Sequence, residues 1–159
     1  MIENDFDPKL FLARIRLIYH GLLGLLIIPT ISFIYIIYNK LLFSFDISKP
    51  FILSTIILSC FILTAGYMFP KMIFTKIDQD DLLINKLHKY RTGQIIRMIT
   101  FEVSGILIMF SFLMTSNLFL LIFLLILVLI MIKYYPTPDK IGKEINLTRN
   151  EIDLFKYYN

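Results

Sequence analysis

Four long apolar stretches separated by polar links dominate the pattern along the chain. They cover roughly residues 17–38, 51–71, 96–114 and 118–135. Each is close to the ~20 consecutive apolar residues that an α-helix needs to cross the hydrocarbon of a bilayer. The pattern therefore predicts an all-α, polytopic integral membrane protein, a bundle of four transmembrane helices with short cytoplasmic helices.

The shortest link lies between the third and fourth stretches and consists of Thr115, Ser116 and Asn117. A connection of three residues leaves no room for the chain to cross to a distant position. We therefore expect the last two helices to form a tight antiparallel hairpin.

Residues 76–94 are polar but carry an apolar stripe. The stripe consists of Leu83, Leu87 and Tyr90, whose spacing fits one face of an α-helix. This pattern predicts a separate amphipathic cytoplasmic segment that lies at the membrane interface or docks on the bundle.

The tail, residues 136–159, has the composition of a soluble segment and two helix-start patterns. Thr137 followed by Pro138 is typical of a capping residue with a first-turn proline. Thr148 and Glu151 have the spacing of a capping box. We expect a cytoplasmic helical tail that either packs beneath the bundle or docks a partner.

Composition agrees with lipid as the solvent of the chain. Hydrophobic residues make up 57%, and the mean hydropathy is +0.74. Soluble domains are usually about 45–50% apolar. The single cysteine, Cys60, lies in an apolar stretch, so no disulfide can form within the chain.

The basic residues fall almost entirely on one side of the four expected spans. Lys40 and Lys49 lie in the first link, and the other fourteen of the sixteen Lys and Arg residues flank the opposite side. The positive-inside rule then places both termini in the cytoplasm. Ten of the twelve Asp and Glu residues share that side, and such a mixed surface indicates contact with the lipid bilayer and not with nucleic acid.

Glu102 is the polar residue with the highest expected cost. It lies five residues beyond Arg97, which is about 7–8 Å further along the third helix. An ionised acid inside the hydrocarbon costs roughly 2.5–3.5 kcal/mol on insertion scales. We expect Glu102 to face the bundle and find a partner there or be protonated, whereas Arg97 is expected to reach the headgroups.

His20 and Glu102 are expected at similar depth, because both of their helices enter from the cytoplasmic side. We hypothesise that Glu102 interacts across the bundle with His20 or with the neighbouring Tyr19. Three interpretations stay open. Glu102 is a clamp between helices, with His20 satisfied by a backbone carbonyl, or it handles protons or ions, or it binds a cationic group of a partner.

Four glycines in the apolar stretches are candidates for close helix packing, because membrane helices approach one another where side chains are small. They are Gly21, Gly24, Gly66 and Gly105.

The chain contains no pattern that carries a known chemistry. A Walker loop, a G-x-G-x-x-G turn, an H-E-x-x-H helix and a pair of metal-binding cysteines are all absent from the sequence. A catalytic zinc site would use almost all of the two histidines and one cysteine available. We therefore expect no catalytic residues, no cofactor and no metal, and an enzyme is the less favoured interpretation.

Three features resemble small four-helix inner-membrane proteins of Bacteroidota-type bacteria. They are the start Tyr19-His20-Gly21, the KYRTGQIIR stretch before Glu102 and the YPTPDK segment of the tail. The resemblance implies a multi-pass membrane bundle in a bacterial inner membrane, and it brings no activity with it.

The sequence favours a non-catalytic integral membrane subunit, or an assembly or stabilising factor, of a larger membrane protein complex. The expected partners are other membrane subunits or further copies of the chain. The alternative is a small proton- or ion-handling transporter element that uses Glu102 and His20 and works as a homo-oligomer.

Overall fold

The computed structural model describes residues 7–37, 46–47 and 49–155, and this part of the chain is built from helices. Residue 38 of the first expected span and residues 156–159 of the expected tail lie outside the described residues. In chain order the helices are α1 (Pro8–Ile37), α2 (Pro50–Phe74), α3 (Leu83–Thr115), α4 (Leu118–Lys133), α5 (Pro138–Glu144) and α6 (Arg149–Asp153).

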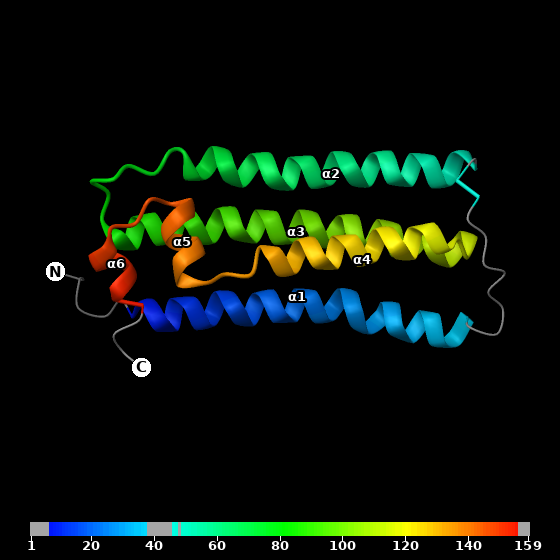
Figure 1. Cartoon of the computed structure of the whole chain (residues 1–159), viewed down its shortest axis with the longest axis horizontal. Helices are drawn as coiled ribbons and strands as arrows, with labels where there is room; N and C mark the ends of the chain where they lie inside the picture. Colours follow the sequence, from blue (N-terminus) through cyan, green and yellow to red (C-terminus); the bar gives the residue numbers. More distant parts are fainter. Residues whose placement is uncertain (1–6, 38–45, 48, 156–159) are drawn as a thin grey trace.

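The four long helices lie side by side with their axes along one direction, and α5 and α6 lie at one end (Figure 1). The described part of α1 begins at this end, which we call the polar end. α3 is the central helix, because it packs against α1, α2 and α4.

Three of the described helices, α1, α2 and α3, are each long and apolar enough to cross a membrane. α4 has 16 residues, which is about 24 Å of helix and shorter than the ~30 Å hydrocarbon core. α5 does not extend it, because the axis bends by 87° between α4 and α5. The fourth expected stretch, 118–135, therefore ends early as a helix, before Pro136 and Pro138, which lack the N–H that would continue it.

The separate amphipathic segment expected over residues 76–94 is not formed. α3 begins at Leu83 and continues without a break, so that residues 83–94 are its first turns. Leu87 and Tyr90 of the expected apolar stripe are buried against the other helices. The sequence permits this continuation, because no proline lies between Leu83 and Thr115 and the apolar face stays in register with the next turns.

The tight hairpin between α3 and α4 is confirmed. Ser116 ends α3 in the left-handed conformation, with φ of 49°, and its N–H donates to the carbonyl of Phe112 at 2.7 Å. Asn117 caps α4 by accepting a hydrogen bond from the N–H of Phe119 at 2.9 Å. Its side-chain amide also donates to the carbonyl of Asp46 at 2.8 Å, which fixes the described start of the α2 segment to the hairpin.

α2 and α3 pack through small residues. The hydroxyls of Thr55 and Ser111 are hydrogen-bonded at 2.8 Å in the interface. Towards the polar end, Gly66 lies directly against Thr100, and the Phe74 ring covers Gly93. These contacts let the two backbones approach closely along most of their length.

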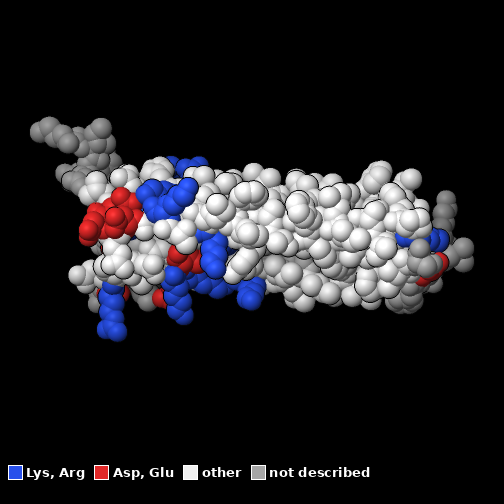
Figure 2. All heavy atoms as spheres, turned by 90° about the horizontal axis from the view of Figure 1, so that it is seen from above, with Lys and Arg blue, Asp and Glu red and all other residues white. Residues whose placement is uncertain are grey.

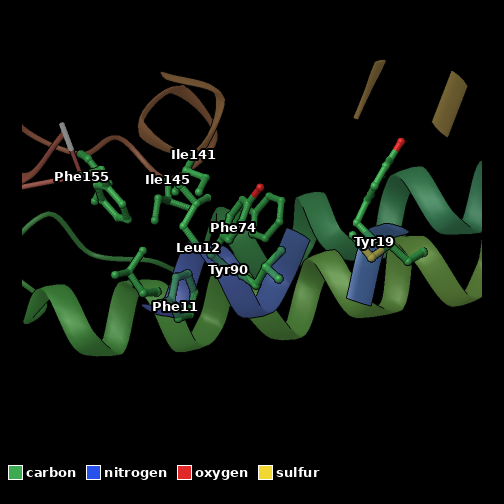
Figure 3. Packing of buried hydrophobic residues seen from close by; sticks show 12 residues of the cluster. Phe11, Leu12, Tyr19, Phe74, Tyr90, Ile141, Ile145 and Phe155 are labelled. Atoms are coloured by element: carbon green, nitrogen blue, oxygen red, sulfur yellow. The ribbon is translucent and has the colours of Figure 1, made fainter. Parts of the chain in front are cut away.

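The tail packs on the bundle, which is the first of the two alternatives that the sequence left open for it. Thr137 caps α5, and Thr148 with Glu151 forms the expected capping box of α6. Side chains of the tail meet those of α1 and α3 in one apolar cluster (Figure 3). Its buried members are Phe11, Leu12, Ile15, Tyr19, Phe74, Leu87, Tyr90, Met98, Ile141, Ile145, Leu147 and Phe155.

Charged side chains gather at the polar end, and a smaller group lies at the opposite end (Figure 2). Between them runs a long surface without charge (Figure 2). Of the described Lys and Arg residues, only Lys49 belongs to a segment at the opposite end.

Candidate functional site

Arg97 is the centre of a polar network at the polar end. Its side chain is 3% exposed. The Nη1 atom donates to Glu144 at 2.9 Å and 3.3 Å and to Oε1 of Gln94 at 3.0 Å. Arg97 does not extend away from the bundle as expected, because Glu144, the last residue of α5, supplies a carboxylate beside its buried side chain.

Two aromatic rings lie against the guanidinium of Arg97. Its Cζ atom lies 4.4 Å from the ring centre of Tyr134 and 5.4 Å from that of Phe74. Gln94 is anchored in turn, because its side-chain amide donates to the carbonyl of Tyr134 at 3.0 Å. Arg97 thus joins α2, α3, the end of α4 and α5 at one point.

A cavity of about 280 Å³ lies beside Arg97. It is lined by Tyr67, Lys71, Phe74, Thr75, Arg97, Tyr134, Glu144 and Asn146. Lys71 is exposed, and the structure places no ion-pair partner beside it among the described residues. The lining combines two cations, one carboxylate and three aromatic rings.

A second ion pair fastens α6 to α3. Lys86 is only 2% exposed, and its Nζ donates to Glu151 at 2.9 Å. Burial alone would raise the pKa of Glu151, but hydrogen bonds from the Thr148 N–H, Lys86 and the Thr148 hydroxyl lower that pKa below its usual range. The capping carboxylate of α6 therefore also serves as the counter-ion of a buried lysine.

Sequence reasoning missed both ion pairs as structural centres. A signal for them exists, because Lys86, Gln94 and Arg97 fall on one face of α3. Two acids of the tail, Glu144 and Glu151, are spaced seven residues apart and match the two cations.

Glu102 is buried at 6% exposure, and neither of its carboxyl oxygens has a hydrogen-bond partner among the described residues. It lies one turn of α3 from Gly105, where an added Cβ would meet the side chains of Leu26 and Leu127. Glu102 thus lies on the face of α3 between α1 and α4. The hypothesised hydrogen bond from His20 or Tyr19 to this carboxyl is absent.

His20 and Tyr19 differ in burial, although the rings of both lie edge-on to the ring of Tyr135, with 5.5 Å between the ring centres of His20 and Tyr135. His20 is exposed, and its ring Nδ1 lies 2.8 Å from the carbonyl oxygen of Arg16 in its own helix. Tyr19 is buried edge-on against the ring of Tyr135 at 5.1 Å, and its hydroxyl has no partner among the described residues. The backbone carbonyl expected as the partner of His20 is thus present, without any contact to Glu102.

The four candidate packing glycines divide into two pairs. Side chains of neighbouring helices occupy the space beside the first pair: Thr100 lies against Gly66, and Leu26 lies against Gly105. Gly21 has nothing within 4 Å of an added Cβ, and Gly24 has only Ile28 of its own helix at 3.9 Å. Among the described residues no other helix packs against Gly21 or Gly24, so their role in helix packing stays a prediction about another chain.

No protein family, curated protein or solved structure matches the chain. The resemblance to small inner-membrane proteins of Bacteroidota-type bacteria gains no support from these comparisons. Function must therefore be inferred from the geometry of the described residues.

The cavity beside Arg97 is lined by polar and charged side chains that could hold a ligand. Its polar lining residues include Lys71, Asn146, Tyr67 and Thr75. Neither a histidine nor a cysteine lines it. Among the described residues no group of three or more His, Cys, Asp or Glu side chains could hold a metal ion.

Proposed function

We propose that the chain is a four-span protein of a bacterial inner membrane with both termini in the cytoplasm. Three described helices are long and apolar enough, and α4 spans as a short fourth helix paired with α3. The basic residues of the polar end support its place on the cytoplasmic side. A span of about 24 Å is accommodated by local thinning of the bilayer or by the shelter of neighbouring helices.

Within this membrane, we propose that the chain is a non-catalytic subunit, or an assembly or stabilising factor, of a larger membrane protein complex. The observation that carries the proposal is the outward face of α1. Its members repeat at helical spacing and lie opposite the buried Tyr19 and Leu26. They are Leu17, Gly21, Gly24, Ile28, Ile31 and Tyr35.

This α1 face is a ridge of large side chains interrupted by two glycines. Leu17 and Tyr35 are 74% and 83% exposed at its two ends. Gly21 and Gly24, one turn apart, leave a depression in the middle that none of the described residues of another helix fills. Such a depression suits the close approach of a transmembrane helix, because packing between membrane helices relies on small residues.

Of the three helices that are long and apolar enough to cross a membrane, α1 is the least buried within the chain. Of its most apolar stretch only 11% is buried, against 22% for α2 and 44% for α3. The occupant we propose is a transmembrane helix of another subunit.

The test is purification of the full chain at natural abundance in native nanodiscs, with mass spectrometry of the proteins that accompany it. We expect a larger membrane assembly in stoichiometric amounts with the wild type, and at least a tenfold loss of it with the double variant Gly21→Leu/Gly24→Leu. Cys60→Leu is the matched control, because Cys60 is exposed on α2.

Two results would contradict the subunit proposal. One is recovery of the chain alone or only as a homo-oligomer. The other is an assembly that survives the double glycine variant as well as it survives Cys60→Leu, because the α1 face would then not be the contact.

A second candidate function is favoured by Glu102 alone. A buried carboxyl without a hydrogen-bond partner is expensive to keep, and intramembrane acids often belong to proton paths. In this alternative a homo-oligomer moves protons through Glu102, and the exposed His20 does not share the site.

Glu102→Gln distinguishes the two functions. We expect this variant to keep its melting temperature and its partners, because neither carboxyl oxygen bonds to another helix. Proton flux into liposomes that contain the purified chain is the second readout, with Ser104→Ala as a buried control on α3. Flux that is present in the wild type and lost only in Glu102→Gln would establish the second candidate, and loss of the fold would show that the carboxyl is a clamp.

A further inference from the structure

We infer that the cavity beside Lys71 and Arg97 binds the phosphodiester headgroup of a glycerophospholipid from the cytoplasmic leaflet. This inference rests on the proposed topology, which places the polar end at the cytoplasmic headgroups. It names a ligand that the subunit proposal does not require.

The charge in the cavity selects an anionic group. Glu144 is the one carboxylate in the wall, and Arg97 already neutralises it at 2.9 Å. Lys71 then contributes a cation that the described residues leave unpaired. An ammonium at a headgroup surface binds phosphate oxygens through short, charge-assisted hydrogen bonds.

Arg97 makes the wall of the cavity rigid before any ligand arrives. The rings of Phe74 and Tyr134, the carboxylate of Glu144 and the amide of Gln94 fix its guanidinium. Its Nε atom is buried and has no hydrogen-bond partner among the described residues. A preorganised cation reduces the conformational entropy that binding would otherwise remove.

The depth of the cavity fits a headgroup. Lys71 lies in the last turn of α2, directly after the uncharged stretch that begins the helix. Tyr67, one turn earlier, lines the cavity on its apolar side and is half exposed. Tyrosine rings concentrate at this level of a bilayer, where one end of the ring is apolar and the phenol is wet.

The size of the cavity fits a headgroup without its acyl chains. A volume of about 280 Å³ lies near the lower end for small-molecule sites, which span roughly 300–1,000 Å³. The phosphodiester and the glycerol carbons beside it would occupy the cavity, and the chains would follow the apolar surface of α2 into the bilayer.

The backbone conformation at the end of α5 places Asn146 beside the cavity. The N–H of Leu147 donates to the carbonyl of Gly142 at 2.9 Å, and this closing bond places Asn146 in the left-handed region with φ of 51°. Asparagine tolerates this conformation better than most residues, and here it lines the cavity.

The test uses the purified, delipidated full chain in mild detergent, titrated with phosphatidylglycerol in mixed micelles. We expect the melting temperature to rise with added lipid, because a ligand that binds only the folded state stabilises it. Diacylglycerol with the same acyl chains lacks the phosphate and is expected to give no rise. Inorganic phosphate, titrated separately, distinguishes a free anion from a lipid.

Lys71→Gln is expected to weaken the apparent affinity for phosphatidylglycerol about tenfold or more, the value of one lost charged hydrogen bond. Lys76→Gln is the matched control, because Lys76 is exposed five residues further on and does not line the cavity. Equal losses in the two variants, or equal effects of phosphatidylglycerol and diacylglycerol, would overturn the site. Inorganic phosphate binding as tightly as the lipid would overturn its assignment to a headgroup. Because the chain is tested alone, these results are independent of whether a partner assembly is recovered.

Discussion

Glu144→Leu is expected to lower the free energy of unfolding by about 3 kcal/mol. The substitution leaves the guanidinium of Arg97 buried at 3% exposure without its counter-ion. Removing one partner of a buried ion pair typically costs about 3–5 kcal/mol, and the low end applies because the Glu144 side chain is 26% exposed. The measurement is denaturant unfolding of the purified chain in detergent micelles, followed by circular dichroism.

The control is the double variant Arg97→Leu/Glu144→Leu. Replacing a buried ion pair by apolar residues of similar size is often neutral, because the desolvation of both charges disappears together. We therefore expect the double variant to be more stable than Glu144→Leu alone, which a double-mutant cycle measures as a coupling between the two sites. Strictly additive losses would show that the contact between Arg97 and Glu144 contributes nothing to the fold.

The second large effect is expected for Gly66→Leu at the interface of α2 and α3. An added Cβ would contact the hydroxyl of Thr100 and lie 2.9 Å from its Cβ and 3.4 Å from the Phe101 ring. Thr100 cannot turn away without loss, because its hydroxyl donates to the carbonyls of Ile96 and Arg97 at 3.0 and 2.8 Å. Overpacking of this kind typically costs about 1–3 kcal/mol, and leucine at this position belongs at the upper end.

Gly21→Leu is the matched control for Gly66→Leu, because Gly21 has open space around it. In the purified chain we expect this control to change the free energy of unfolding by less than about 0.5 kcal/mol. Similar losses in the two variants would mean that α2 does not pack on α3 through Gly66. Thermal unfolding in detergent micelles, with the same two variants, is an independent measurement of the difference.

Leucine at Gly21 distinguishes an effect on the stability of the chain from an effect on its assembly with a partner. The leucine is tolerated by the chain alone, since nothing contacts Gly21 within the fold. The double variant Gly21→Leu/Gly24→Leu, which contains this substitution, is expected to weaken the complex if the outward face of α1 meets a partner helix. A variant that unfolds the isolated chain would not give this separation.

Local sequence was sufficient wherever a few neighbouring residues decide the structure. The caps Thr137 and Thr148 and the α3–α4 hairpin follow from residues within one turn of each other. The helical structure of the apolar stretches follows from their length and composition. Where water is absent, the backbone N–H and C=O groups must be hydrogen-bonded within the segment, and a helix does this.

The lengths of the helices depended on more distant contacts. Residues 83–94 continue into α3 because Leu87 and Tyr90 find the tail and α1 as neighbours. Their polar residues had suggested a surface segment, but the tail supplies the carboxylate that lets Lys86 be buried. A sequence window cannot contain this information, since the two partners are 65 residues apart.

The candidate sites divide in the same way. The sequence by itself determined that Glu102 and Arg97 lie on an apolar helix, and that small residues would line the helix contacts. Only the tertiary structure decided that Arg97 turns to Glu144, 47 residues away, and that Glu102 has no partner among the described residues. It also decided that His20 faces outward, because the rotation of α1 is set by which of its faces buries the most apolar surface against α3.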